Sequence, residues 1–216
     1  MGEKKMEYAS GITQEMIDKA VAFHGHWCGG LATGVRVAAW AMENFGVAAD
    51  EEIVAVAESD MCAIDAIQAL VGCTMGKGNL ILRDCGKVAF SFYRRRDGKA
   101  LRAVERFDPD DPVNARMLQI RRELMSQNIS EWIRTRFEVE LTALRKKKLE
   151  RTLSADFGEL FLVGEPSAAV PPFARRLPSV PCDGCGEGVM SSKIVRIGGK
   201  KLCMDCAARE EANGKA

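Results

Sequence analysis

The sequence Phe23-His24-Gly25-His26-Trp27-Cys28-Gly29-Gly30 places two histidines and a cysteine, which can bind a metal or transfer a proton, within five residues. It contains both histidines of the 216 residues and places a cysteine two positions after the second one. Residues 31–40 are small and apolar and predict a helix. Cys28 would then lie at a helix N-terminus, where unpaired N–H groups and the helix dipole favour a thiolate. The motif predicts a metal or catalytic site; the alternative is a buried histidine pair beside an inert cysteine.

The composition excludes several classes of protein. The chain has 31 basic and 30 acidic residues, so no global field recruits nucleic acid or an anionic membrane. No apolar run is long enough to predict a transmembrane helix. The first residues lack the apolar core of a signal peptide, so we expect a cytoplasmic, reducing setting. There, the eight cysteines indicate metal binding or catalysis rather than disulfides.

The hydrophobic periodicity predicts an α+β fold. Helices are expected at 13–23, 31–45, 62–71, 113–126 and 131–153, and strands at 53–57, 80–82, 88–93 and 100–104. Turn residues at 86–87 and 96–99 predict two consecutive hairpins. We therefore expect an antiparallel or mixed sheet packed with helices, rather than a doubly wound sheet. The apolar piece 157–163 is expected to dock as a strand or turn.

Three regions follow from the distribution of proline and cysteine. Residues 1–164 are predicted to form the α+β metal-binding domain. Residues 165–181 are rich in proline and should form an extended, semi-rigid linker. Residues 182–216 are predicted to form a small zinc-ribbon domain.

Four cysteines near the end of the chain have the spacing of a structural zinc site. Two C-x-x-C pairs, separated by residues 186–202, fit the four-cysteine class: Cys182, Cys185, Cys203 and Cys206. A hairpin is expected between the pairs, turning at 198–199. So short a segment cannot bury enough apolar surface to fold alone, and zinc would contribute on the order of 10 kcal/mol. Four thiolates close the coordination shell, so we expect no catalysis there; ribbon spacing makes a redox dithiol the weaker alternative.

A second cysteine joins the N-terminal motif in our preferred ligand set. Cys62 follows the strand 53–57 and begins a predicted helix, so it resembles Cys28 in its placement. The expected ligands are Cys28, His26 and Cys62. His24 is either a fourth ligand or a base that does not bind the ion directly. Asp65, one turn after Cys62, could bind the ion or orient one of its ligands. Mixed cysteine and histidine ligation suits zinc or another transition metal, and an open position would make the site catalytic.

Other polar groups are assigned more modest roles. A helix over 62–71 would separate Cys62 from Cys73 by roughly 16 Å, too far to share one ion. Cys73 and Cys85 are predicted to be buried small residues. The glycine-rich loop 72–78 fails the Walker pattern, which leaves an anion nest with Lys77 near the site or a simple turn. The basic run 145–148 is expected to be a solvated helix end; contact with nucleic acid is the alternative.

These motifs together resemble the FmdE family of formylmethanofuran dehydrogenase components. The matching patterns are F-H-G-H-x-C-x-G, E-S-x-x-C-x-x-D-A-I-Q and G-C-T-x-G-K-G-N-L. Residues 157–161 and 182–187 are similar to members that carry a C-terminal zinc finger. The resemblance implies an α+β homodimer with a Cys/His metal site in each protomer. It also implies an accessory role beside a molybdenum or tungsten oxidoreductase that reduces carbon dioxide. Where the family usually has proline, this chain has Gly29, which loosens the turn.

Two functions remain open at this point. In the first, the protein is metal-dependent and works in one-carbon or molybdopterin-linked redox metabolism. Cys28 is then ligand or nucleophile, and His24 or His26 is ligand or base. Asp65 orients a ligand and Lys77 contacts an anion. In the second, the protein is a regulatory or adaptor module whose first metal is structural and whose zinc ribbon binds a partner protein or nucleic acid. Three protein ligands at the first metal favour the former function, and four favour the latter.

Overall fold

The computed structural model describes residues 8–126, 128–175 and 177–213. The chain divides into two compact units, one up to Phe173 and one from Ala174 onward. The division falls inside the proline-rich stretch 165–181. Strand β6 (Ser179–Pro181), however, belongs to the second unit rather than to a linker. No helix among the described residues has the length and apolar character needed to span a membrane.

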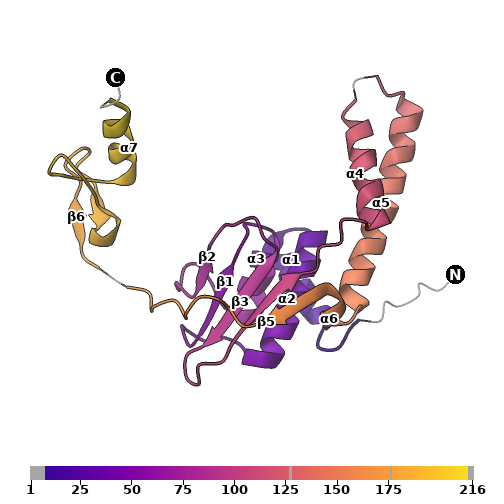
Figure 1. Cartoon of the computed structure of the whole chain (residues 1–216), viewed down its shortest axis with the longest axis horizontal. Helices are drawn as coiled ribbons and strands as arrows, with labels where there is room; N and C mark the ends of the chain where they lie inside the picture. Colours follow the sequence, from indigo (N-terminus) through magenta and orange to yellow (C-terminus); the bar gives the residue numbers. More distant parts are fainter. Residues whose placement is uncertain (1–7, 127, 176, 214–216) are drawn as a thin grey trace. The chain divides into compact units, whose positions relative to one another are not determined.

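Five strands form the sheet of the first unit, in the order β2-β1-β3-β4-β5. They are β1 (Ile53–Ala57), β2 (Leu80–Leu82), β3 (Ala89–Arg94), β4 (Ala100–Glu105) and β5 (Phe161–Gly164). β1 is parallel to β2 and antiparallel to β3, and the pairs β3–β4 and β4–β5 are antiparallel. Helices pack on this mixed sheet (Figure 1), which confirms the predicted α+β class.

The hairpin predicted between 80–82 and 88–93 is wrong. β2 lies on the far side of β1 from β3, and the intervening chain passes around the end of β1. There Arg83 N–H donates to the carbonyl of Ala57, and Cys85 N–H to that of Glu58. The side chain of Asn79, which is fully buried, donates to the carbonyl of Ile53 at 3.0 Å. These bonds hold β2 beside β1, so residues 86–87 turn the chain without joining a hairpin.

Two long helices and a short one build the layer that carries the candidate site. They are α1 (Gln14–His24), α2 (Gly29–Phe45) and α3 (Ala63–Ala66), the last continued by the π-helix η1 (Ile67–Val71). The single α-helix expected over 62–71 is therefore a short α-helix with a π-helical end. The helices pack on the sheet face formed by alternate strand residues, including Ala55, Phe90 and Phe92.

Small residues bring α2 and α3 unusually close together. A Cβ added to Gly34 would lie 2.6 Å from both the Cα and the carbonyl oxygen of Ala63. No side chain fits that gap, so the two backbones approach each other here as only glycine permits. This close packing sets the start of α2 against the start of α3, where the candidate ligands lie.

The opposite face of the sheet carries a smaller apolar cluster of Val54, Val56 and Tyr93. Part of the stretch predicted to be a linker binds at this side. Tyr93 donates its hydroxyl to the carbonyl of Ala168 at 3.0 Å, and the guanidinium of Arg95 lies 3.9 Å from the ring centroid of Phe173. Residues 165–173 are therefore anchored to the first unit instead of being an independent spacer.

A helical hairpin, α4 (Pro112–Leu124) and α5 (Glu131–Ser154), forms an arm that projects from the sheet layer (Figure 1). Asp111 and Ser130 cap the two helices through their side-chain oxygens. A small cluster of Met117, Ile120 and Leu141 holds the arm together. The C-terminal part of α5 packs against α2, and α6 (Phe157–Leu160) then leads into β5.

The second unit consists of two short hairpins and a helix. β6 pairs with β7 (Gly188–Met190), and β8 (Val195–Ile197) pairs with β9 (Lys200–Leu202). The second hairpin turns at Gly198 and Gly199, both with positive φ, as predicted. A 3-10 turn (Ser191–Lys193) joins the hairpins, and α7 (Met204–Asn213), which the sequence pattern did not predict, ends the unit.

Candidate metal centre and adjoining pocket

The turn between α1 and α2 brings three donor side chains together. α1 ends at His24, and Gly25 takes the left-handed conformation, with φ 94°, that reverses the chain. α2 begins directly after Cys28. As a result, one ligand atom each from His24, His26 and Cys28 lies within 4.8 Å of the others. This group matches three of the four ligands expected from the sequence.

Cys28 is the N-cap of α2, as its position in the sequence predicts. Its Sγ accepts the N–H of Leu31 at 3.4 Å and lies 3.8 Å from Nε2 of His24. An ion about 2.3 Å from a thiolate and about 2.0 Å from an imidazole nitrogen holds these two atoms about 3.5 Å apart at the tetrahedral angle. The observed separation therefore suits two ligands on one edge of a coordination tetrahedron.

Asp65 orients the imidazole ring of His24 through its Nδ1 atom. Its Oδ2 lies 2.7 Å from Nδ1 of His24, and Nε2 of Gln68 donates to its Oδ1 at 3.3 Å. Gln68 in turn accepts the N–H of Met75. With Nδ1 bonded to a carboxylate, Nε2 of His24 is the nitrogen left to face the metal, the arrangement common in zinc sites. Of the two roles predicted for Asp65, the geometry corresponds to orienting a ligand.

Cys62 lies beside this group but outside it. Its Sγ is 3.5 Å from the position a Cβ would occupy on Gly30, which places it against the first turn of α2. Burial, together with the neighbouring Cys28 thiol, raises the pKa of Cys62. The group of three mutually close donors does not include Cys62, so the structure places Cys62 next to the cluster rather than in it.

Lys77 does not join the cluster. Its Nζ donates to the carbonyls of Ala48 and Ala49, which precede β1, whereas Cys62 follows the opposite end of that strand. The other two cysteines differ from each other. Cys73 is fully buried, as predicted, and burial raises its pKa to about 12. Cys85 is exposed, so the prediction of a buried residue is wrong there; its thiol donates to the carbonyl of Arg83.

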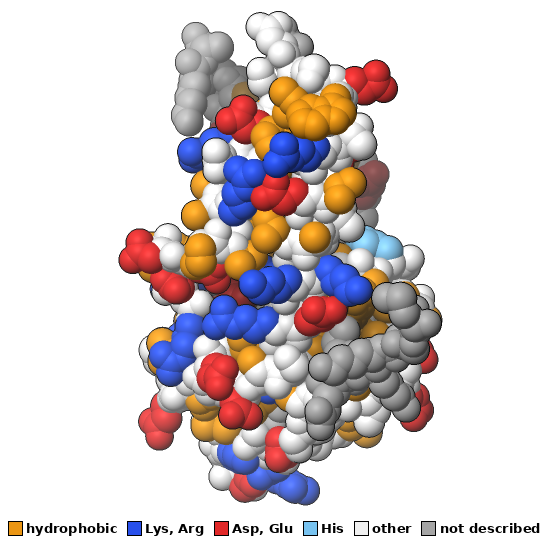
Figure 2. All heavy atoms as spheres, turned by 90° about the vertical axis from the view of Figure 1, so that its right-hand side faces the viewer, with side chains coloured by type: hydrophobic (Ala, Val, Ile, Leu, Met, Phe, Trp, Pro, Cys, Tyr) orange, Lys and Arg blue, Asp and Glu red, His pale blue; other side chains and the backbone are white. Residues whose placement is uncertain are grey.

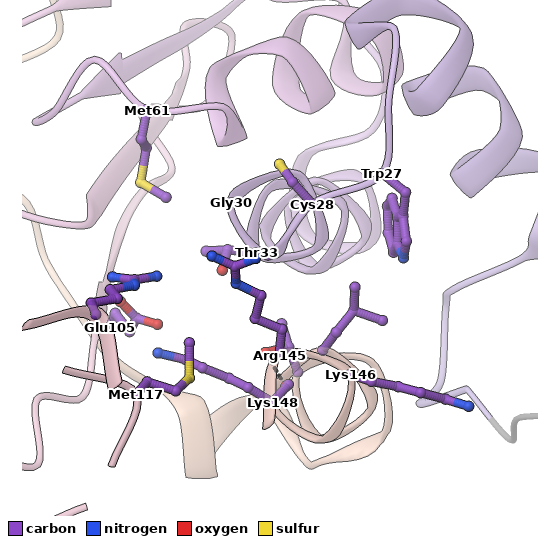
Figure 3. A pocket seen from close by; sticks show the side chains of 14 residues that line it. Trp27, Cys28, Gly30, Thr33, Met61, Glu105, Met117, Arg145, Lys146 and Lys148 are labelled. Carbon is purple, nitrogen blue, oxygen red and sulfur yellow. Dashed lines mark hydrogen bonds between the residues drawn. The ribbon is translucent and has the colours of Figure 1, made fainter. Parts of the chain in front are cut away.

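A pocket of about 560 Å³ adjoins the start of α2. Its walls come from Trp27, Cys28, Gly29, Gly30 and Thr33 on one side, and from α4 and α5 on the other. Figure 3 shows Arg145 reaching from α5 toward Thr33, Lys148 reaching toward Glu105, and Lys146 turned away from both. The basic run 145–148 is therefore not merely a solvated helix end, because two of its side chains point into this pocket.

Sequence reasoning missed the pocket because it treated the basic run as one patch. Residues 145, 148, 149 and 152 have helical spacing and share one face of α5, and all four line the pocket. Arg121, Met117 and Glu105 come from segments that no sequence motif linked to the site. Burial raises the pKa of Glu105, an effect that the charge of Lys148 opposes.

The four C-terminal cysteines form a closed metal group. Their ligand atoms lie within 4.8 Å of one another, and Sγ of Cys185 is 4.0 Å from Sγ of Cys203. Zinc with bonds of about 2.3 Å to four thiolates needs sulfur separations of about 3.8 Å. A Cβ on Gly184 would lie 2.9 Å from Sγ of Cys206, so glycine is needed for this turn to approach the site. The donor set fits structural zinc, as predicted.

Backbone N–H groups point at these sulfurs. Cys203 N–H donates to Sγ of Cys182 at 3.2 Å, and Gly184 N–H donates to the same atom at 3.4 Å. These donors, that of Cys203 first, lower the pKa of Cys182 to about 6. The protein thus stabilises at least one thiolate before an ion binds.

Comparison with known proteins agrees with this architecture. Residues 23–162 match the family described as "FmdE, Molybdenum formylmethanofuran dehydrogenase operon". Residues 175–212 match the prokaryotic dksA/traR C4-type zinc finger. The first match covers more than half of the chain and contains all three clustered donors. The chain belongs to the FmdE family and carries a C-terminal zinc finger.

Two individual proteins extend the comparison. A crystal structure of a tungsten formylmethanofuran dehydrogenase FmdE-like protein from Syntrophus aciditrophicus has a similar fold, with a TM-score of 0.59 and 20% identity over 94% of this chain and 98% of that one. A protein of Archaeoglobus fulgidus described as a probable S-adenosyl-L-methionine-binding protein is 31% identical over 206 residues. That match covers 88% of this chain, which spans about half the length of the relative, 51%.

Proposed function

We propose that the first unit is a transition-metal module in which His24, His26 and Cys28 hold one ion and leave a coordination position for water or a ligand. The observation that carries this proposal is the group of three donors within 4.8 Å, with Asp65 bonded to Nδ1 of His24. When bound, such an ion would act as a Lewis acid toward the ligand in its open position. The zinc of the second unit is structural, because four thiolates surround it.

The chain's own residues prepare the site in three ways. Asp65 holds His24 in one tautomer and directs its Nε2 toward the ion. The N–H of Leu31 donates to Sγ of Cys28 at 3.4 Å and so fixes the position of that sulfur at the start of α2. Gly29, in the first turn of α2, lines the neighbouring pocket without a side chain that could extend into it.

Metal analysis of the full chain tests this proposal. We expect about two metal ions per chain in the wild type and about one in Cys28→Ser or His24→Gln. The control is Cys85→Ser, which removes an exposed thiol outside both groups and should keep two ions. One ion per chain in the wild type, or two in Cys28→Ser, would contradict the proposal.

The physiological setting is part of the same proposal. It is an accessory or enzymatic role in one-carbon, molybdopterin-linked redox metabolism, beside a molybdenum or tungsten enzyme in the cytoplasm. The family description, which names a molybdenum formylmethanofuran dehydrogenase operon, supports the link to such an enzyme. Exposed apolar side chains on the arm support a homodimer: Met125 is 85% exposed, Trp132 70% and Val139 67%. Sedimentation should show a dimer at micromolar concentration, and a monomer would contradict that part.

The adaptor function predicts a different coordination of the N-terminal metal. In that alternative the ion is purely structural and has four protein ligands, and the zinc finger binds a partner protein or nucleic acid. Rotation of Cys62 toward the ion would supply the fourth ligand. Loss of metal from Cys62→Ser, to the same extent as from Cys28→Ser, would favour the adaptor over the open site.

A second candidate function is binding of S-adenosylmethionine, favoured by the description of the Archaeoglobus relative. The pocket opposes it, because the sulfonium and ammonium groups would meet Arg121, Arg145 and Lys148. We expect no retention of S-adenosylmethionine in equilibrium dialysis at micromolar concentrations. Retention that Arg145→Gln strengthens would establish this second function.

A further inference from the structure

The pocket beside Cys28 has an excess of positive charge that the protein itself does not neutralise. Among the described residues, Arg121 and Arg145 make no ion pair. Lys148 Nζ donates to the neutral Oδ1 of Asn114 at 2.9 Å. Glu105 is the one carboxylate in the lining. Figure 2, which faces the arm, shows several basic side chains across the middle of the molecule, with acidic and apolar side chains between them.

The start of α2 adds unpaired donors to the same wall. α2 runs from Gly29 to Phe45, and Gly29 and Gly30 in its first turn line the pocket. N–H groups in a first turn have no partner within the helix, and the dipole of a long helix favours an anion there. Helix N-termini together with arginine side chains are a common arrangement for binding phosphate.

The remaining walls suit an organic group. Trp27, Met61, Met117 and Leu149 give the pocket an apolar lining beside its cations. Figure 3 shows Trp27 and Met61 at opposite sides, with Arg145 and Lys148 entering from α5. The volume of about 560 Å³ lies within the range of small-molecule sites, roughly 300–1,000 Å³. A molecule of nucleotide size fits, whereas inorganic phosphate alone would leave the apolar walls in contact with water.

We infer that this pocket binds a small organic phosphate, with its phosphate groups between Arg121, Arg145, Lys148 and the start of α2, and its organic part against Trp27 and Met61. The inference deepens the proposed function and rests on it for the metal that adjoins the pocket. It assigns to the arm a role in ligand binding, because α4 supplies Arg121 and α5 supplies Arg145 and Lys148. It also accounts for Arg145 and Lys148, which make no ion pair with the described residues, whereas Lys146 of the same basic run lies 4.0 Å from Glu150.

Calorimetric titration of the full chain with ADP at low salt tests the inference. We expect micromolar affinity for ADP, no measurable binding of adenosine, and at least tenfold weaker binding of ADP to Arg145→Gln and Lys148→Gln. Lys147→Gln is the matched control. It removes the same charge from the same helix at a position outside the pocket lining and should leave ADP affinity unchanged. Equal thermal midpoints of all three variants would show that they fold alike.

Several outcomes would overturn the inference. They are no ADP binding at millimolar concentration, equal binding of adenosine, tighter binding of citrate than of ADP, or an equal effect of Lys147→Gln. Metal content is measured on the same samples, and Arg145→Gln should keep its two ions. Loss of ADP binding with two ions present contradicts the inference alone. A wild type with only one ion contradicts the proposed function, whatever its affinity for ADP.

Discussion

The two cysteine-containing groups of this protein use similar ligand chemistry toward different ends. The C-terminal group has four thiolates from two turns, and a small unit folds around it. The group before α2 has one cysteine and two histidines, and it lies on a unit with an extensive apolar core. The C-terminal group supplies four donors, enough to close a tetrahedral shell, whereas the group before α2 supplies three, and its Cys28 lines a basic pocket. Under the proposed function, the C-terminal ion maintains a fold and the N-terminal ion serves a ligand.

The largest effect is expected from Cys182→Ser. The second unit buries few apolar side chains apart from its cysteines, notably Leu202 and Ala207, so zinc supplies most of its stability. Loss of one ligand should remove about one metal ion per chain and unfold residues 177–213, while the first unit stays folded. Hydrogen exchange with metal analysis measures both. If residues 177–213 kept their protection from hydrogen exchange after losing zinc, the C-terminal ion would not be needed for folding and the two sites would not differ in this respect.

Asp65→Asn should weaken the first site without removing a ligand. The amide can still bond to Nδ1 of His24, but it no longer supplies a negative charge behind the imidazole. Such changes typically lower metal affinity 10–100-fold. Competition with a chelator measures the affinity, and Asp60→Asn, an exposed residue nearby, is the control. An unchanged affinity would mean that Asp65 does not support the metal.

Gly34→Ala tests the close packing that sets α2 against α3. The new Cβ would lie 2.6 Å from the backbone of Ala63, which cannot yield as a side chain could. Overpacking of this kind costs about 1–3 kcal/mol and would also separate Cys28 and His24 from Asp65. Thermal unfolding and metal affinity should both fall. Gly29→Ala, whose Cβ meets nothing within 4 Å, should leave thermal stability almost unchanged.

Cys28→Ser should have the smallest effect on folding. Serine is a good N-cap, and the core around Leu31 and Val35 does not depend on the metal. Compared with metal-free wild type, we expect a change in stability of less than about 1 kcal/mol. Urea unfolding of the first unit measures it. Unfolding as complete as that of the second unit in Cys182→Ser would make both metals structural.

The sequence predicted most of the local structure because the signals there are local. Thr13, Cys28 and Ser130 were expected at helix starts and are the N-caps of α1, α2 and α5. The four-cysteine group follows from spacing alone. The parallel pairing of β2 was missed because it depends on Asn79 bonding to a distant carbonyl. The pocket was missed because Arg121, Glu105 and Arg145 come together only when α5 packs against α2.

The most direct test of the contrast between the two sites is a crystal structure of the full chain with anomalous scattering measured across the zinc edge. We predict one peak among the four C-terminal sulfurs. A second peak should lie within bonding distance of Sγ of Cys28 and Nε2 of His24, with a non-protein ligand completing its shell. A single peak per chain, or a second ion enclosed by four protein ligands, would contradict the account.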